Sequence, residues 1–91
     1  MLIVIQVKKI VVYSKKGCHL CERAISELEQ LRSVGNFDLT TRDITEDAEI
    51  YERYKNIIPV ISVDGAVKLA GSAVSNPLTL KEVLKRAIFS P

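Results

Sequence analysis

A strand followed at once by a helix is predicted for residues 8–31, KKIVVYSKKGCHLCERAISELEQL. Residues 8–14 form a β-branched run that ends at Lys16-Gly17, which is typical of a strand running into a loop. From Cys21 onward the apolar residues recur at the spacing of one helix face, at positions 21, 24, 25, 28 and 31. Both cysteines of the chain, Cys18 and Cys21, therefore fall where the strand gives way to the helix.

The middle of the chain predicts a second strand and a second helix. Residues 37–44 alternate between apolar and polar side chains, as a half-buried strand does. A helix then opens at Asp43 or Thr45, because acidic residues fill its first turns and basic residues its end, which suits the helix dipole. We expect the inner stripe of this helix to consist of Ile50, Tyr54 and Ile57.

The last third predicts a hairpin and a closing helix. Asp64-Gly65, between the apolar runs 59–63 and 66–69, is a strong signal for a two-residue hairpin turn. Residues 79–82, TLKE, match a capping box, so we expect Thr79 to cap the final helix. The order β-α-β-α-β-β-α begins with a right-handed parallel unit and ends with an antiparallel hairpin. It predicts an α/β fold with a four-stranded mixed sheet and helices on both faces.

The chain is expected to form a single domain over residues 1–91, with residues 1–7 as an extra strand or a loose extension. Its 91 residues suffice for a hydrophobic core without staples. A net charge of +2, mixed along the chain, and 5% aromatic residues give no reason to expect nucleic-acid binding. Lys8-Lys9 interrupts the apolar N-terminus, which is too short to span a membrane. We therefore expect a cytoplasmic protein without membrane contact, and its small faces of mixed charge favour a monomer.

Cys18 is expected at the start of the first helix, where a thiolate is stabilised. Unpaired N–H groups and the positive end of the helix dipole favour an anion there. Lys15, Lys16 and His19 add positive charge, so we expect the pKa of Cys18 to lie in the range of about 3.5–7.5 known for such sites. Cys21 lies one turn inward, on the core face. We therefore predict that Cys18 attacks a substrate disulfide and that Cys21 resolves the mixed disulfide.

Other interpretations of the cysteine pair stay open. Tetrahedral zinc needs two further good ligands, but the chain has no other cysteine and its one histidine, His19, lies between the pair. An iron–sulfur cluster could instead be shared by Cys18 of two chains. The domain could also be an adaptor whose cysteines are vestigial, whereas a structural disulfide is disfavoured in a reducing cytosol. We favour a redox pair without a bound metal or cofactor.

Proline at the start of a strand is a further candidate feature. Pro59 is awkward inside a sheet because it lacks a backbone N–H. A cis Ile58-Pro59 bond would let the backbone of Ile58 offer its N–H and C=O to an extended substrate. The alternative is a trans proline that merely opens an edge strand.

The chain resembles the glutaredoxin branch of the thioredoxin-like superfamily from Lys8 onward. Tyr13-Ser14-Lys15-x-Gly17-Cys18-x-x-Cys21 is similar to the glutaredoxin stretch Y-S-K-x-x-C-x-x-C, and Pro59-Val60 with Asp64-Gly65 is similar to P-x-V…N/D-G. The resemblance implies a thioredoxin-like fold with a cis proline before the third strand. It also implies a dithiol oxidoreductase that acts on disulfide-containing proteins, and a glutathione carboxylate held by Lys15.

Two departures from the glutaredoxin pattern concern the electron donor. Ile57-Ile58-Pro59 stands in place of Thr-Val-Pro and lacks its polar side chain. Residues 69–73, LAGSA, replace the paired glycines and the aspartate that would hold the amine of glutathione. Glutathione and a thioredoxin reductase therefore both stay open as electron donors.

Overall fold

The structure is a computed structural model that describes residues 7–33 and 35–89, with only the backbone described at residues 88 and 89. Its four strands lie in the order β2-β1-β3-β4. The central strand β1 (Lys8–Ser14) runs parallel to β2 (Phe37–Asp43) and antiparallel to β3 (Val60–Val63). β4 (Ala66–Ala70) forms one edge of the sheet, antiparallel to β3, and β2 forms the other. The predicted four-stranded mixed sheet is confirmed.

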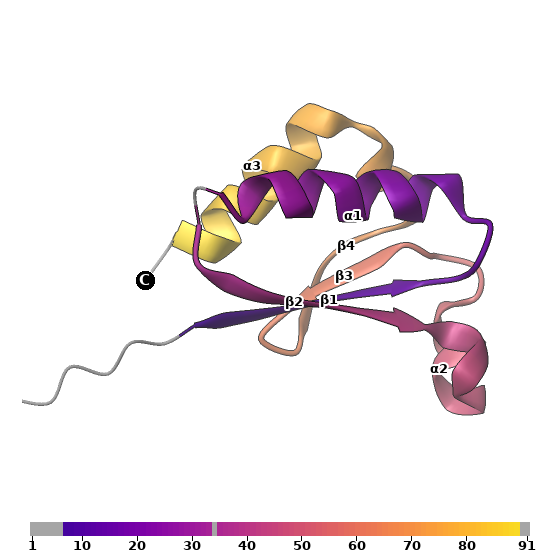
Figure 1. The fold of residues 1–91 in the computed structure, drawn as a ribbon. Helices are drawn as coiled ribbons and strands as arrows, with labels where there is room; N and C mark the ends of the chain where they lie inside the picture. The colour runs from indigo at the N-terminus through magenta and orange to yellow at the C-terminus, as the bar shows by residue number, and fades with distance from the viewer. Residues whose placement is uncertain (1–6, 34, 90–91) are drawn as a thin grey trace, which may run out of the picture.

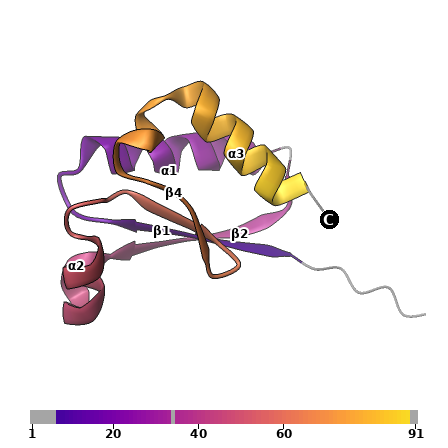
Figure 2. The ribbon, with the colours of Figure 1, turned by 180° about the vertical axis from the view of Figure 1, so that it is seen from behind.

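Two helices cover one face of this sheet, α1 (His19–Leu31) and α3 (Pro77–Phe89), as Figure 1 and the reverse view in Figure 2 both show. Alternate residues of a strand share a face, and the buried residues of β1 on the helix side are Ile10 and Val12. They belong to one core cluster with buried residues of both helices, among them Ala24, Leu28, Leu80 and Leu84. The core therefore lies between the sheet and the pair α1 and α3.

The short helix α2 (Ala48–Tyr54) lies on the other side of the sheet, beyond the end of β2 (Figure 1). The aromatic ring of Tyr54, in this helix, contacts the ring of Tyr13 in β1, and the two ring centroids are 4.9 Å apart. The predicted inner stripe is wrong in part, because no residue of α2 is buried and Ile57 is 42% exposed. The reason is that the helix ends at Tyr54, so Ile57 belongs to the following loop.

The predicted hairpin turn at Asp64-Gly65 is confirmed. Both residues have positive φ, 51° and 86°, which is the conformation of a two-residue type I′ turn and explains the Asp-Gly sequence. Asp64 also joins the turn to β1. Its Oδ1 accepts a hydrogen bond from the N–H of Lys9 at 2.8 Å, and its own N–H donates to the Lys9 carbonyl at 2.8 Å.

The starts of α2 and α3 correct the sequence prediction. Asp43 caps a single 3₁₀ turn, Ile44–Glu46, and Asp47 caps α2 by accepting from two backbone N–H groups. In α3 the cap is Asn76 and not Thr79, because Asn76 Oδ1 accepts from the N–H groups of Leu78 at 3.0 Å and Thr79 at 3.3 Å. Pro77 occupies the first helical position, where its missing N–H has no consequence.

The prediction of an extra strand or a loose extension at residues 1–7 falls almost entirely on residues that the structure does not describe. Residues 1–6 fall outside the described ranges, and Val7 precedes β1 and is 38% exposed. Within residues 7–33 and 35–89, no helix has both the length and the apolar run that a membrane crossing requires.

Candidate active site

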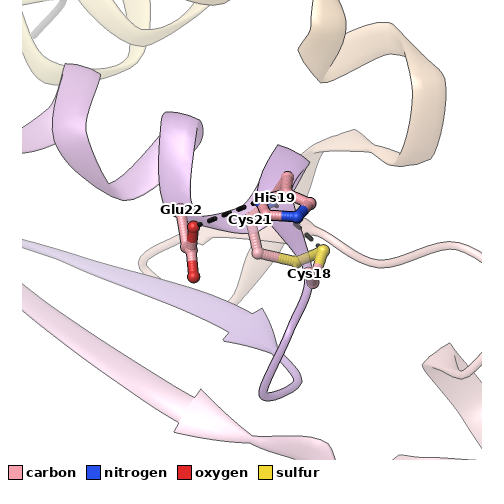
Figure 3. Close-up of a disulfide and its surroundings, with 4 residues drawn as sticks. All are labelled: Cys18, His19, Cys21 and Glu22. Atoms are coloured by element: carbon pink, nitrogen blue, oxygen red, sulfur yellow. Dashed lines mark hydrogen bonds and ion pairs between the residues drawn. A yellow bond between two sulfur atoms is a disulfide. The ribbon is translucent and has the colours of Figure 1, made fainter.

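Cys18 and Cys21 form a disulfide at the start of α1, with their Cα atoms 5.2 Å apart (Figure 3). Cys18 is the N-cap residue of the helix, as predicted, and Cys21 lies in the first turn. The helix positions the pair because the strand β1 ends at Ser14 and a four-residue loop leads directly into α1. The spacing of three residues on a helix brings the two side chains to the same face.

The two sulfur-bearing residues differ in burial. Cys21 is 1% exposed and lies at the base of the helix face that packs on the core, whereas Cys18 is partly exposed. A disulfide on another molecule can therefore approach Cys18 more easily than Cys21. The order of attack, Cys18 first and then Cys21, stays a prediction.

One backbone N–H group faces the Cys18 sulfur, and a second bonds to the Cys18 carbonyl. The N–H of Cys21 donates to Cys18 Sγ at 3.2 Å, and the N–H of Glu22 donates to the Cys18 carbonyl at 3.1 Å. At the N-terminus of a helix such donors and the aligned peptide dipoles create a positive potential. A thiolate formed at Cys18 after reduction would occupy this potential, which stabilises the charged form of the thiol.

A tight turn over residues 15–18 precedes the helix. It is closed by the Cys18 N–H, which donates to the Lys15 carbonyl at 3.1 Å. Gly17 has a φ of +84°, the value that a type II turn requires at its third position and that glycine adopts without strain. Lys15 and Lys16 are both exposed in this turn, next to Cys18.

His19 is the first residue of α1, and its side chain is 94% exposed. Its Nδ1 lies 3.6 Å from Glu22 Oε2, one turn along the helix (Figure 3). The nearest charged partner of His19 is thus a carboxylate on its own helix. A protonated His19 would be partly neutralised by Glu22, a partner that the sequence prediction did not include.

The predicted substrate-binding residues Ile58 and Pro59 enter the same end of the sheet. Tyr13 pairs with Val60 across β1 and β3, so the segment before Val60 lies next to the segment after Tyr13. The Ile58-Pro59 bond is cis, as predicted, and Pro59 is buried while Ile58 is partly exposed. The Pro59 carbonyl accepts from the Gly71 N–H at 2.9 Å, which joins the end of β4 to this loop.

Asp43 also lies in this region, although the sequence analysis considered it only as a possible helix cap. Its Oδ1 accepts from the Thr45 hydroxyl at 2.6 Å and from the Thr45 N–H at 2.8 Å. These two hydrogen bonds, and then the charge of Lys15, hold the pKa of Asp43 below its ordinary value of 3.8. Ser14 pairs with Asp43 in the parallel register, so aligning the two predicted strands could have revealed this neighbour of Lys15.

Metal-ligating side chains do not gather elsewhere in the described ranges. Among residues 7–33 and 35–89, no group of three or more His, Cys, Asp and Glu side chains is arranged to hold a metal ion. The cysteine pair has only His19 and Glu22 close by in sequence, and these two face each other.

Comparison with known proteins gives a family and a fold. A family model described as "Glutaredoxin-like domain (DUF836)" matches residues 9–88. The solution NMR structure of protein Ne2328 from Nitrosomonas europaea is similar with a TM-score of 0.68 and 27% identity, over 79% of this chain and 87% of that one. No curated protein matches the sequence.

A second solved structure, described as that of a malarial protein, has a TM-score of 0.64 at 13% identity. The similarity covers 90% of this chain and 98% of that chain, and it concerns the fold alone. Together with Ne2328 it confirms the predicted thioredoxin-like fold.

Proposed function

This chain belongs to the family of glutaredoxin-like domains (DUF836), and from that membership we propose that it is a thiol–disulfide oxidoreductase. The observation that carries the proposal is the contrast within the cysteine pair. Cys18 is partly exposed at the start of a helix, and Cys21 is 1% exposed behind it. The substrates are disulfides of proteins or small molecules, and Cys18 is the sulfur that they reach.

The reaction has two exchange steps. The Cys18 thiolate attacks one sulfur of the substrate disulfide, so a mixed disulfide forms and the other substrate sulfur leaves as a thiolate. The Cys21 thiolate then attacks Cys18 Sγ, which closes the Cys18–Cys21 disulfide and releases the second substrate thiolate. The substrate gains two electrons and the protein loses two. A thiol donor, either glutathione or a thioredoxin reductase, returns the protein to its dithiol form.

A thiolate at Cys18 is required for the first step. The helix start, the Cys21 N–H, and the positive charges of Lys15, Lys16 and protonated His19 all lower the pKa of Cys18 in the reduced protein. Titration of the thiolate by its ultraviolet absorbance tests this point. We expect a step well below the pKa of about 8.5 of free cysteine, and we expect Cys18→Ser to remove it. A wild-type step near the free-cysteine value would contradict the assignment.

Lys15, Ile58 and Pro59 are the proposed substrate-binding residues. Lys15 precedes the cysteine turn and supplies positive charge for a carboxylate, such as one of glutathione. Ile58 is partly exposed beside β1 and offers backbone groups to an extended polypeptide, while buried Pro59 fixes the loop. No bound cofactor enters this scheme. We further propose a monomer that works in the cytoplasm.

The test is a disulfide-reduction assay run in parallel with two electron donors. One arm contains glutathione with glutathione reductase, and the other contains a thioredoxin reductase with its nicotinamide cofactor. We expect catalytic reduction in at least one arm, lost in the Cys18→Ser variant. Failure in both arms with protein and small disulfides would favour an adaptor with vestigial cysteines. Stoichiometric zinc or iron after anaerobic purification would favour a metal or cluster module instead.

A further inference from the structure

Lys16 occupies the outer corner of the active-site turn. In the turn closed by the Cys18 N–H and the Lys15 carbonyl, it holds the second position, next to Gly17. Its side chain is exposed. Two residues of chain span at most about 7 Å between Cα atoms, so Lys16 stays within about one Debye length of Cys18 at physiological ionic strength. From this position the long, exposed side chain of Lys16 can bring its charge to a group bound at the Cys18 sulfur.

Among the described residues the charge of Lys16 has no counterpart, whereas a carboxylate lies near each of its two basic neighbours. Lys15 lies near the carboxylate of Asp43, and His19 lies 3.6 Å from Glu22. Within the part of the chain that the structure describes, no carboxylate comes within ion-pair distance of Lys16. Lys16 therefore leaves a net positive potential beside the reactive sulfur, and a negative group on a partner can meet it.

Apolar residues precede β3 at the end of the sheet where the site lies. Ile57 is 42% exposed and precedes Ile58-Pro59, which lies beside the end of β1. The end of the sheet that bears Cys18 thus offers a basic residue, Lys16, and the segment that enters β3 there offers an exposed apolar one, Ile57. This combination fits a polypeptide segment better than a small, fully charged disulfide.

We propose that Lys16 makes this dithiol selective for protein disulfides whose attacked half-cystine is flanked by acidic residues. The inference rests on the proposed function and adds the substrate class to it. Lys16 attracts the substrate carboxylate and takes no part in the exchange of electrons, which proceeds as written above. Exposed charge pairs of this kind alter rates of encounter more than the chemical step, and they weaken with salt.

The experiment uses the pre-reduced protein as the only reductant, so no external donor is needed. Its substrates are three synthetic peptide disulfides of one sequence, with Asp, Asn or Lys on both sides of the half-cystine. Acidic neighbours also make a cysteine a poorer leaving group, so each rate is divided by the rate with neutral dithiothreitol. We expect the Asp peptide to be reduced about three- to tenfold faster than the Lys peptide at low salt, and the ratio to approach one at high salt.

Substitutions test whether Lys16 causes the preference for the Asp peptide over the Lys peptide. Lys16→Gln is expected to bring the ratio close to one, and Lys16→Glu to invert it. Lys9→Glu is the matched control, because Lys9 is also exposed and lies at the opposite end of β1 from the active-site turn. It changes the net charge by the same amount and is expected to keep the wild-type ratio. A preference that survives in Lys16→Gln, or that Lys9→Glu removes as well, overturns the inference.

Two further outcomes separate this inference from the proposed function. Reduction of all three peptides at equal normalised rates would contradict the selectivity proposed for Lys16, but it would agree with the proposed oxidoreductase activity. Reduction of none, the neutral Asn peptide included, sinks the oxidoreductase itself. Oxidised glutathione is tested in parallel because it too carries carboxylates near its disulfide, and Lys16 could attract these as well. Because Lys16 also acts on the pKa of Cys18, the rates of each variant with the Asp peptide and with glutathione are divided by its rate with the neutral Asn peptide. After this division, an effect of Lys16→Glu on the Asp peptide and not on glutathione supports the assignment to polypeptides, and an equal effect on both overturns that assignment.

Discussion

At the scale of single residues, Cys18 and Cys21 have the same side chain but different surroundings. Cys18 caps α1 and is partly exposed, while Cys21 faces the core and is 1% exposed. The difference follows from their positions at the helix start, since three residues carry the chain from the cap to the inner face. It gives the two sulfurs different expected roles.

Replacement of each cysteine by serine separates these roles. Cys18→Ser is expected to reduce disulfide-reduction activity to the background rate, because no exposed thiolate remains. Cys21→Ser is expected to stop after the first exchange, so a mixed disulfide on Cys18 accumulates. Intact-mass analysis detects this adduct, which dithiothreitol should remove. A stable adduct on Cys18→Ser in place of Cys21→Ser would reverse the assigned order.

Asp43 predicts a pH dependence of stability. Its pKa in the folded protein is below 3.8 because of its bonds with Thr45 and the charge of Lys15. At Asp43 the folded state therefore binds fewer protons than the unfolded state in this pH range. The stabilisation of the folded state by ionised Asp43 is fully present above the pKa of this residue in the unfolded chain. It disappears as pH falls through the lower folded pKa. We expect the stability difference between wild type and Asp43→Asn to be constant above pH about 5 and to shrink below pH about 4.

Urea unfolding at a series of pH values measures this difference. Asp38→Asn serves as the control, because Asp38 is exposed on the same strand and its carboxylate has no hydrogen-bond partner within the described residues. A difference for Asp43→Asn that stays constant down to pH about 2 would contradict the assigned cause.

At the scale of elements, the helix starts were the least predictable feature. The pattern TLKE at residues 79–82 predicts a cap at Thr79, but Asn76 and Pro77 supply a competing start three residues earlier. Asparagine is as good a cap as threonine or better, and proline is favoured at the first helical position. With Asn76 as the cap, the Thr79 N–H is already bonded at 3.3 Å. Local motifs of similar strength thus compete, and the helix takes the earlier one.

Alanine substitutions test which residue caps α3. Asn76→Ala is expected to lower the free energy of unfolding by about 0.5–2 kcal/mol, because two backbone N–H groups lose their acceptor. Thr79→Ala is expected to change it by less than about 0.5 kcal/mol, since Thr79 is exposed within the first helical turn. Chemical denaturation measures both values. A larger loss for Thr79→Ala would restore the capping box.

At the scale of the whole molecule, stability depends on the one-sided core between the sheet and the pair α1 and α3. Leu84 of α3 is fully buried there, whereas Leu78 on the same helix is 76% exposed. Leu84→Ala is expected to lower the free energy of unfolding by about 2–5 kcal/mol, because it removes buried apolar atoms and leaves a cavity. Leu78→Ala, the matched control, is expected to change it by about 0.5 kcal/mol or less. Urea unfolding of the oxidised protein measures both, and equal losses would contradict the assigned core.

The sequence by itself determined the order of elements, the Asp-Gly turn and the place of Cys18 at a helix start. Each of these depends on local periodicity or on the conformational preferences of a few adjacent residues. The tertiary structure alone decided the exposure of Ile57 and the hydrogen bond that joins the Pro59 carbonyl to Gly71 at the end of β4. Those features depend on where a helix stops and how strands align, and both are fixed by packing and register across residues far apart in the chain.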